Sequence, residues 1–198
     1  MNRLPGGLVG ALVIVPVAGL AILYAWPFAT LVIEAVDKES IRSVLGRSRT
    51  WSIVWFTTWQ AVVSTLLTVI VGLVPAWVIA RFDFAGRRIL LGLLTALFVL
   101  PTVVMGAAIL ALLPDTLDRT VWAVLGAHVV FNLAVTVRAV GTVWEHLPAD
   151  MEDAAATLGA APLVVFREIT LPLIRPAVAA AAAIIFLFTF TSFGVIRV

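Results

Sequence analysis

Residues 51–80 read WSIVWFTTWQAVVSTLLTVIVGLVPAWVIA, a run without Asp, Glu, Lys or Arg that ends at Arg81. A helix needs about 20 mostly apolar residues to cross a bilayer, whereas a strand of a membrane barrel needs about 9–11 and alternates between apolar and polar positions. The run is far too long for such a strand and does not alternate. It therefore predicts a transmembrane helix that tilts or projects beyond the bilayer, because it exceeds the length of a perpendicular span.

The composition of the whole chain also indicates a membrane environment. Of its 198 residues, 63% are hydrophobic and 12% are charged, and the mean hydropathy is +1.15. An average soluble domain is about 45–50% apolar and about 25% charged. These values exclude a soluble enzyme, a nucleic-acid-binding protein and a disordered regulator. The net charge of only +2 leaves no basic patch for a nucleic acid, and the absence of cysteine excludes disulfides, thiolate metal sites and cysteine nucleophiles.

Four further segments have the length and composition of membrane spans: residues 8–33, 89–113, 121–137 with a continuation to 144, and 176–196. The first is predicted to be an uncleaved span, because its apolar run is longer than the core of a signal peptide and no cleavage site follows it. Kinks are expected at Pro16, Pro27, Pro75 and Pro101, which membrane helices tolerate. The predicted fold is an all-α, polytopic membrane protein, with about five transmembrane helices in a single domain over residues 1–198.

The charged residues between the spans predict the orientation. With the N-terminus inside the cell, the inner basic residues are Arg3, Arg81, Arg87, Arg88, Arg138, Arg167 and Arg175, and the outer ones are Lys38, Arg42, Arg47, Arg49 and Arg119. The larger inner set favours this orientation, because cytoplasmic loops are enriched in Lys and Arg. In the outer connection, Ile41 and Leu45 lie one helical turn apart, which predicts a short amphipathic helix at the interface.

The connection 145–176, EHLPADMEDAAATLGAAPLVVFREITLPLIRP, is too long and too patterned for a simple turn. Asp150 is predicted to cap a helix that has further acids in its first turn. Gly159 is a typical left-handed helix end, and Pro162 prevents simple continuation. A second short helix, 163–169, is expected to lead into the last span. The pattern predicts a helix-turn-helix whose small-residue surface a partner can approach; the alternative is a re-entrant segment without a partner.

The spacing within this connection resembles a known family. Asp153-Ala154-Ala155 is followed by three residues and Gly159, and nine more residues lead to Ile169-Thr170-Leu171-Pro172. This resembles the EAA loop of binding-protein-dependent ABC importer permeases, whose pattern is Glu-Ala-Ala, three residues, Gly, nine residues and Ile-x-Leu-Pro. The chain departs from it by having Asp153 in place of the usual Glu, and the neighbouring Glu152 is an alternative acidic contact.

Four other segments extend the resemblance over nearly the whole chain. Residues 80–88 resemble the cytoplasmic loop between the second and third spans of this family, 100–104 its third span, and 128–132 its fourth. Residues 188–195, FTFTSFGV, resemble the fifth span of permeases from thiamine and ferric-iron importers. The resemblance implies import of thiamine or ferric iron, with sulfate, molybdate, polyamine or phosphonate as the alternatives.

The resemblance also implies a set of partners and a set of coupling residues. The partners are a dimer of ABC ATP-binding subunits, an extracytoplasmic solute-binding protein, the lipid bilayer, and a second permease half that is identical, distinct or fused. The residues implied in coupling to the ATPase are Asp153, Ala154, Ala155, Gly159, Ile169, Leu171 and Pro172. The chain itself is expected not to be an enzyme: it lacks a Gly-x-x-x-x-Gly-Lys-Ser/Thr phosphate loop, so ATP hydrolysis is expected in a separate subunit. No cofactor and no metal are expected. The location is the inner or plasma membrane, and the chain is expected to be a fragment that lacks a sixth span.

Several polar residues within the spans are candidates for lining the solute pathway: His128, Asn132, Arg138, Thr191 and Ser192. Ionisable residues at membrane depth are often functional. The alternatives are that Arg138 extends to the inner interface and that the others form hydrogen bonds between helices. A different class of function, a membrane redox subunit with His128 as a haem ligand, remains a second hypothesis.

Overall fold

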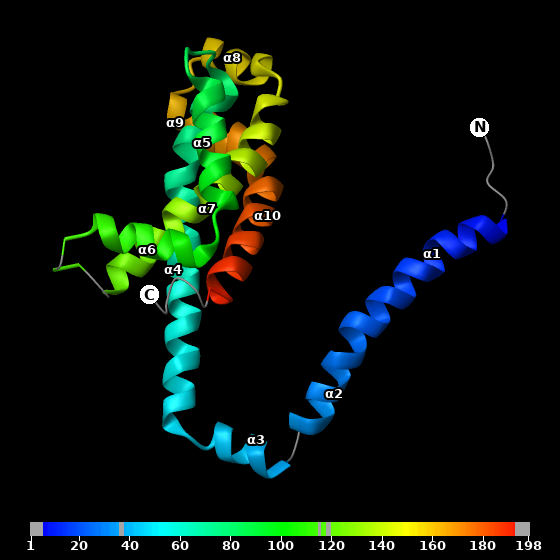
Figure 1. Cartoon of the computed structure of the whole chain (residues 1–198). Helices are drawn as coiled ribbons and strands as arrows, with labels where there is room; N and C mark the ends of the chain where they lie inside the picture. Colours follow the sequence, from blue (N-terminus) through cyan, green and yellow to red (C-terminus); the bar gives the residue numbers. More distant parts are fainter. Residues whose placement is uncertain (1–5, 36–37, 115, 118–119, 193–198) are drawn as a thin grey trace. The chain divides into compact units, whose positions relative to one another are not determined.

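The computed structural model describes residues 6–35, 38–114, 116–117 and 120–192 (Figure 1). These residues form α-helices, two π-helical segments and no strand. The segments are α1 (Gly6–Leu20), η1 (Ala21–Ala25), α2 (Trp26–Ala35), α3 (Lys38–Leu45), α4 (Ser48–Arg81), α5 (Arg87–Val99), α6 (Thr102–Leu112), α7 (Val121–Glu145), α8 (Ala149–Thr157), α9 (Pro162–Val165), η2 (Phe166–Thr170) and α10 (Leu171–Phe190). The all-α prediction is confirmed.

The chain divides into two compact units, 1–54 and 55–198. In the first unit, α1, η1 and α2 follow one another without a break, and the stretch Leu12–Glu34 is long and apolar enough to span a membrane. None of the side chains in its most apolar window is buried within the chain. The predicted short helix between the first two spans is confirmed as α3, and Trp51 Nε1 donates to the carbonyl of Leu45 at its end, at 2.9 Å.

Each of the two π-helical segments is followed, after one intervening residue, by a proline. In η1 the Trp26 amide donates to the Ala21 carbonyl, and Pro27 follows; in η2 the Leu171 amide donates to the Phe166 carbonyl, and Pro172 follows. Proline has no N–H, and in an α-helix its ring clashes with the carbonyl four residues earlier. A single widened turn relieves that clash. This is why the helical path continues through both prolines.

The core of the second unit lies among α4, α7 and α10, which run side by side in Figure 1. Its buried members are Val69, Ala76, Val140, Trp144, Ile174, Ala177, Ala181 and Ile185. A smaller apolar cluster joins α5 to the same helices, through Ile79, Leu94, Ala134 and Val137. The predicted helices over 51–80 and 121–144 are confirmed as α4 and α7.

Small and polar side chains set the register between α4 and α7. Ser64 faces His128 across the interface, with 3.1 Å between Oγ and Nδ1. About two helical turns further along the same interface, Gly72 lies against Thr136. Ala76 lies against Gly141 beyond that. Residue numbers rise together along both helices, so α4 and α7 are parallel. A parallel pair is what the predicted topology requires of the second and fourth spans.

Replacing Gly72 with alanine is expected to destabilise the chain by about 1–3 kcal/mol, because overpacking of a tight contact forces the helices apart. An ideal Cβ at position 72 would lie 2.6 Å from Thr136 Cβ. Thermal unfolding in detergent measures the effect. Gly92→Ala is the matched control, since nothing lies within 4 Å of a Cβ at that helical position. Equal stability of the two variants would contradict the register.

Two predicted spans need correction. The expectation of a single span over 89–113 is wrong in shape, because α5 and α6 are separate helices bent by 110° at Leu100-Pro101. The Pro101 kink is thus confirmed, as a sharp break. The predicted start of the last span at Pro176 is also wrong: the helical stretch runs over Pro162–Phe190 and includes Pro172 and Pro176. Its predicted end at 196 lies outside the described residues.

Candidate functional site

The connection 145–176 folds as the predicted helix-turn-helix. The first helix, α8, begins after Pro148, and Asp150 lies in its first turn together with Glu152. The expectation that Asp150 caps this helix is wrong, because Pro148 occupies the cap position and no side chain caps it. Pro148 has an extended conformation, and the helix begins directly after it. The two acids interact favourably with the positive N-terminal end of the helix dipole.

A Schellman motif ends α8 at the predicted glycine. Gly159 has φ +87°, its amide donates to the Ala156 carbonyl at 2.9 Å, and the Ala160 amide donates to the Ala155 carbonyl at 3.1 Å. This pair of bonds satisfies carbonyls that the helix end leaves free. Pro162 then occupies the first turn of α9, where its missing N–H costs nothing. The reversal between the two helices is therefore encoded locally.

Replacing Gly159 with alanine is expected to loosen this turn without any steric clash. Nothing lies within 4 Å of an added Cβ, so the cost is the left-handed backbone alone, about 1–2 kcal/mol. Hydrogen exchange at the Gly159 and Ala160 amides should become about 5–30-fold faster. Gly159→Asn should show a smaller effect, because asparagine tolerates this conformation. Unchanged exchange in the alanine variant would contradict the assigned turn.

The inner face of α8 is held by an ion pair. Arg81, the last residue of α4, places Nη2 3.0 Å from Glu152 Oε1 and donates from Nη1 to the Leu147 carbonyl at 3.1 Å. Thr170 Oγ1 donates to the same Glu152 oxygen at 2.6 Å. The Arg81 and Glu152 side chains are only 15% and 27% exposed. We call Arg81, Glu152 and Thr170 the inner clamp; it joins α4, α8 and η2.

A second ion pair lies at the same end of the unit. Arg87, at the start of α5, has Nη2 2.8 Å from Glu145 Oε1 at the end of α7. Its Nε also donates to the carbonyl of Ile79 at 3.1 Å. The two arginines therefore fix the ends of α4, α5 and α7 around the base of the connection.

The outer face of the connection carries exposed apolar side chains. Leu158 is 89% exposed and Leu163 is 75% exposed, and Met151 and Val164 of the same connection are also exposed. We call Met151, Leu158, Leu163 and Val164 the outer patch. Asp153, Ala154 and Gly159 are exposed as well, whereas Glu152 belongs to the inner clamp. Of the two neighbouring acids, Asp153 is thus the one accessible to a partner.

The other candidate coupling residues lie away from the outer patch. Ala155 and Ile169 are half-buried, and Leu171 packs against the main core at the start of α10. Pro172 is exposed and follows the π-helical turn. The structure therefore separates the motif into an accessible part on α8 and a part that anchors the base of α10.

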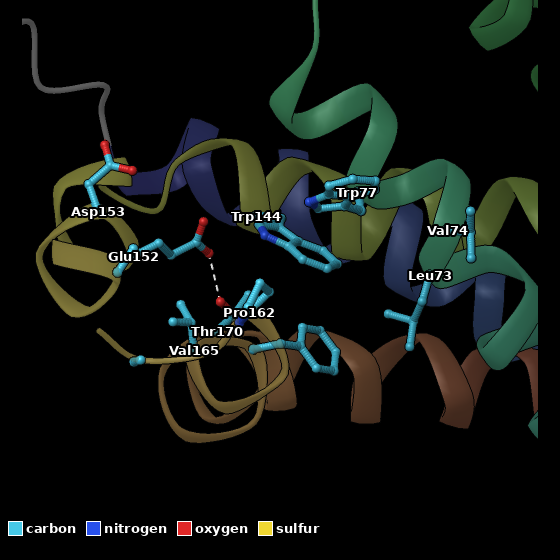
Figure 2. A pocket seen from close by; sticks show the side chains of 12 residues that line it. Leu73, Val74, Trp77, Trp144, Glu152, Asp153, Pro162, Val165 and Thr170 are labelled. Carbon is cyan, nitrogen blue, oxygen red and sulfur yellow. Dashed lines mark hydrogen bonds between the residues drawn. The ribbon is translucent and has the colours of Figure 1, made fainter. Parts of the chain in front are cut away.

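A pocket of about 490 Å³ lies behind α8 (Figure 2). Its apolar walls come from α4, α7 and α9 and include Trp77, Trp144 and Val165. Glu152 and Thr170 of the inner clamp also line it, as does Asp153. Trp144 is 4% exposed, and its Nε1 has no hydrogen-bond partner among the described residues.

The candidate pathway residues do not form one cluster. His128 and Asn132 are each 1% exposed on the α4-facing side of α7, and Asn132 Nδ2 donates to the His128 carbonyl at 2.9 Å. Asn132, Thr191 and Ser192 line a second pocket of about 220 Å³. Arg138 is exposed and donates to Thr95 Oγ1 of α5, away from that pocket.

The sequence alone did not predict the inner clamp or the ion pair between Arg87 and Glu145. The sequence indicates Arg81 only as the end of an apolar run and as one of the inner basic residues, and Thr170 only as the variable position of Ile-x-Leu-Pro. The one available signal was the pair of adjacent acids at 152 and 153, of which only one can face outward on a helix.

Comparison with known proteins places the chain in a family. The family model described as binding-protein-dependent transport system inner membrane component matches residues 68–197. The sulfate transport system permease protein CysT of Salmonella typhimurium is 32% identical over 69% of this chain and 54% of its own length. The thiamine transport system permease protein ThiP of Escherichia coli is 32% identical over 74% of the chain and 30% of its own length. The putrescine transport system permease protein PotI of Escherichia coli is 30% identical over 90% and 70%.

The chain thus spans about half the length, or less, of the first of these relatives. Its described residues contain four helices able to span a membrane, or five if the bent pair α5 and α6 is one span. The chain is a multi-pass protein of the inner membrane and belongs to the family of binding-protein-dependent transport system inner membrane components.

Proposed function

We propose that this chain is part of the permease of an ATP-driven importer and that α8 and α9 dock on a separate ATP-binding subunit. The observation that carries the proposal is the two-sided character of the connection 145–176. Its inner face is tied to the bundle by the inner clamp, while its outer patch leaves large apolar side chains exposed. Exposed apolar patches of this kind mark interaction sites.

The chemistry of the outer patch defines the partner surface. An apolar cleft is needed to cover Leu158 and Leu163, with a basic group placed to meet the exposed Asp153. The small side chains of Ala154 and Gly159 allow a close approach of the partner's backbone. ATP hydrolysis belongs to that partner, because this chain has no phosphate-binding loop.

The inner clamp supplies a route from the docked helix to the spans. Glu152 of α8 contacts the end of α4 through Arg81 and the start of the last helical stretch through Thr170. A displacement of α8 on ATP-driven closure therefore moves two spans together. Alternating access in transporters rests on rigid-body movement of this kind.

The transported solute is proposed to be thiamine or ferric iron, delivered by an extracytoplasmic binding protein, with a second permease half completing the pathway. Support comes from residues 188–195 and from the thiamine permease among the relatives. Relatives named for sulfate and putrescine make these the alternatives.

Reconstitution tests the proposal. The full-length permease, its ATP-binding subunit and its binding protein are placed in proteoliposomes, and uptake of radiolabelled thiamine, ferric iron, sulfate and putrescine is compared with and without ATP. ATP-dependent uptake of thiamine or ferric iron supports the proposal. Uptake of sulfate or putrescine alone would correct the solute, and absence of ATP-dependent uptake for all four would contradict the transport function.

A further inference from the structure

A pocket of about 220 Å³ lies where α5, α6, α7 and the end of α10 meet. Three phenylalanines line it, one each from α5, α7 and α10: Phe98, Phe131 and Phe188. The ring centroid of Phe98 lies 5.5 Å from that of Phe131 and 5.9 Å from that of Phe188. The three rings therefore form one aromatic wall. Thr102, Thr191, Ser192 and Asn132 supply the polar part of the lining.

Asn132 has an unused acceptor in this setting. Its side chain is 1% exposed and its Nδ2 donates to the His128 carbonyl, but its buried Oδ1 has no donor within the described part of the chain. A buried acceptor without a donor lowers the stability of the folded protein. Asn132 Oδ1 therefore carries this cost unless a ligand supplies the donor. A bound solute that donates a hydrogen bond would satisfy it.

The charge environment of the pocket favours one class of ligand. Among the described residues, no acidic or basic side chain lines it; the lining consists of three aromatic rings, the Asn132 amide and the hydroxyls of Thr102, Thr191 and Ser192. Aromatic faces attract cations and repel anions. A sulfate-like anion would find no positive group in this lining, and a strongly hydrated metal ion would find no carboxylate.

The depth of the pocket suits a step in translocation. Asn132 lies about 20 Å from the Glu145 end of α7 and about 16 Å from its Val121 end, at a rise of about 1.5 Å per residue. It is therefore close to the middle of the span. Binding sites of secondary transporters lie near the bilayer midplane, and the 110° break between α5 and α6 places non-helical backbone at the edge of this pocket.

We propose that this pocket is a transient binding site for an organic cation with an apolar body, whose N–H or O–H group donates to Asn132 and whose positive charge lies against the three phenylalanines. The inference rests on the proposed transport function and narrows its substrate class. Among the solutes considered, the organic cations thiamine and putrescine fit this chemistry, whereas ferric iron and sulfate do not; of the two cations, thiamine alone has rings that can stack on the aromatic wall.

The test uses Asn132→Leu and Phe131→Leu in the reconstituted full-length transporter, with radiolabelled thiamine as the probe. The readout is the ratio of thiamine taken up to ATP hydrolysed, together with the ATPase stimulation by loaded binding protein and the thermal stability of the complex. We expect the ratio to fall about tenfold in both variants, because each loses a contact to the solute. ATPase stimulation should be kept, and Asn132→Leu should not lower the melting temperature, because it removes an unmet polar atom.

Phe190→Leu is the matched control, since Phe190 is an aromatic residue of the same bundle that does not line the pocket. It should keep the wild-type ratio. A wild-type ratio in Asn132→Leu and Phe131→Leu, or uptake of sulfate or ferric iron in preference to thiamine by the unmodified transporter, would overturn the inference. Failure of the proposed function itself has a different signature, which is loss of ATP-dependent uptake for every solute in the unmodified transporter.

Discussion

Replacing Leu158 with aspartate is expected to abolish the association of the permease with its ATP-binding subunit and, with it, all uptake. Leu158 is 89% exposed at the end of α8, so the substitution removes no contact within the chain. A leucine buried at an interface contributes about 1.5–3 kcal/mol, and a carboxylate in its place adds a desolvation cost. The combined loss is about 3 kcal/mol or more, which weakens the complex over a hundredfold.

Co-purification of the ATP-binding subunit and ATP-dependent uptake in proteoliposomes measure this effect. Leu158→Met is the matched control, because it keeps an apolar side chain of similar size and should retain both activities. The yield and melting temperature of the isolated permease should be the same in both variants. Normal co-purification and uptake in Leu158→Asp would show that the outer patch is not the docking surface.

The second large effect is expected from Glu152→Gln, which should uncouple ATP hydrolysis from transport without releasing the ATP-binding subunit. Glutamine keeps an oxygen to accept the Thr170 hydrogen bond but removes the ion pair with Arg81. Removing one partner of a buried pair costs about 3–5 kcal/mol, and the partial exposure of this pair lowers that to about 1–3 kcal/mol. The docked α8 would then move without carrying α4 with it.

The measurement is the ratio of uptake to ATP hydrolysis, with co-purification as the reference. Thr170→Val removes only the hydrogen bond from Thr170 to Glu152. The double variant Arg81→Gln/Glu152→Gln removes both charges of the ion pair. Compared with Glu152→Gln alone, it should recover thermal stability but not the ratio of uptake to ATP hydrolysis. Asp153→Asn, on the outer face, should instead weaken co-purification. Full coupling in Glu152→Gln with normal association would contradict the role of the clamp.

The helices that sequence reasoning placed well are those whose signal is local. The uncharged run over 51–80 predicts α4 because no other structure satisfies the backbone of such a run in lipid. Gly159 predicts the end of α8 because a left-handed residue is needed there, and the observed φ of +87° agrees.

The errors arise where the outcome depends on packing. Pro101 predicts a break, but the 110° change of direction between α5 and α6 cannot be read from a proline in the sequence. The last helical stretch begins before the predicted start at 176, because the widened turn over Phe166–Thr170 lets the helix continue through Pro172 and has no sequence signal. The clamp between Arg81 and Glu152 joins residues far apart in the chain, so only the fold brings them together.

The candidate pathway residues show the same limit. Helical spacing correctly puts His128 and Asn132 on one face of α7, but the spacing does not distinguish their partners. In the structure, His128 contacts Ser64 of α4, whereas Asn132 lines the aromatic pocket. Arg138, two turns further along, contacts α5 instead.

Site-directed photocrosslinking tests the docking of α8 most directly. The 198 residues contain no cysteine, so Leu158→Cys, in a full-length permease whose cysteines outside these residues are replaced by serine, gives a unique attachment point for a thiol-linked benzophenone. Leu112→Cys, 81% exposed at the end of α6, gives its control. We predict that the probe at 158 crosslinks to the ATP-binding subunit, that the probe at 112 does not, and that a membrane-impermeant thiol reagent added to intact cells does not label position 158. Labelling of position 158 from outside, or equal crosslinking from both positions, would contradict the account.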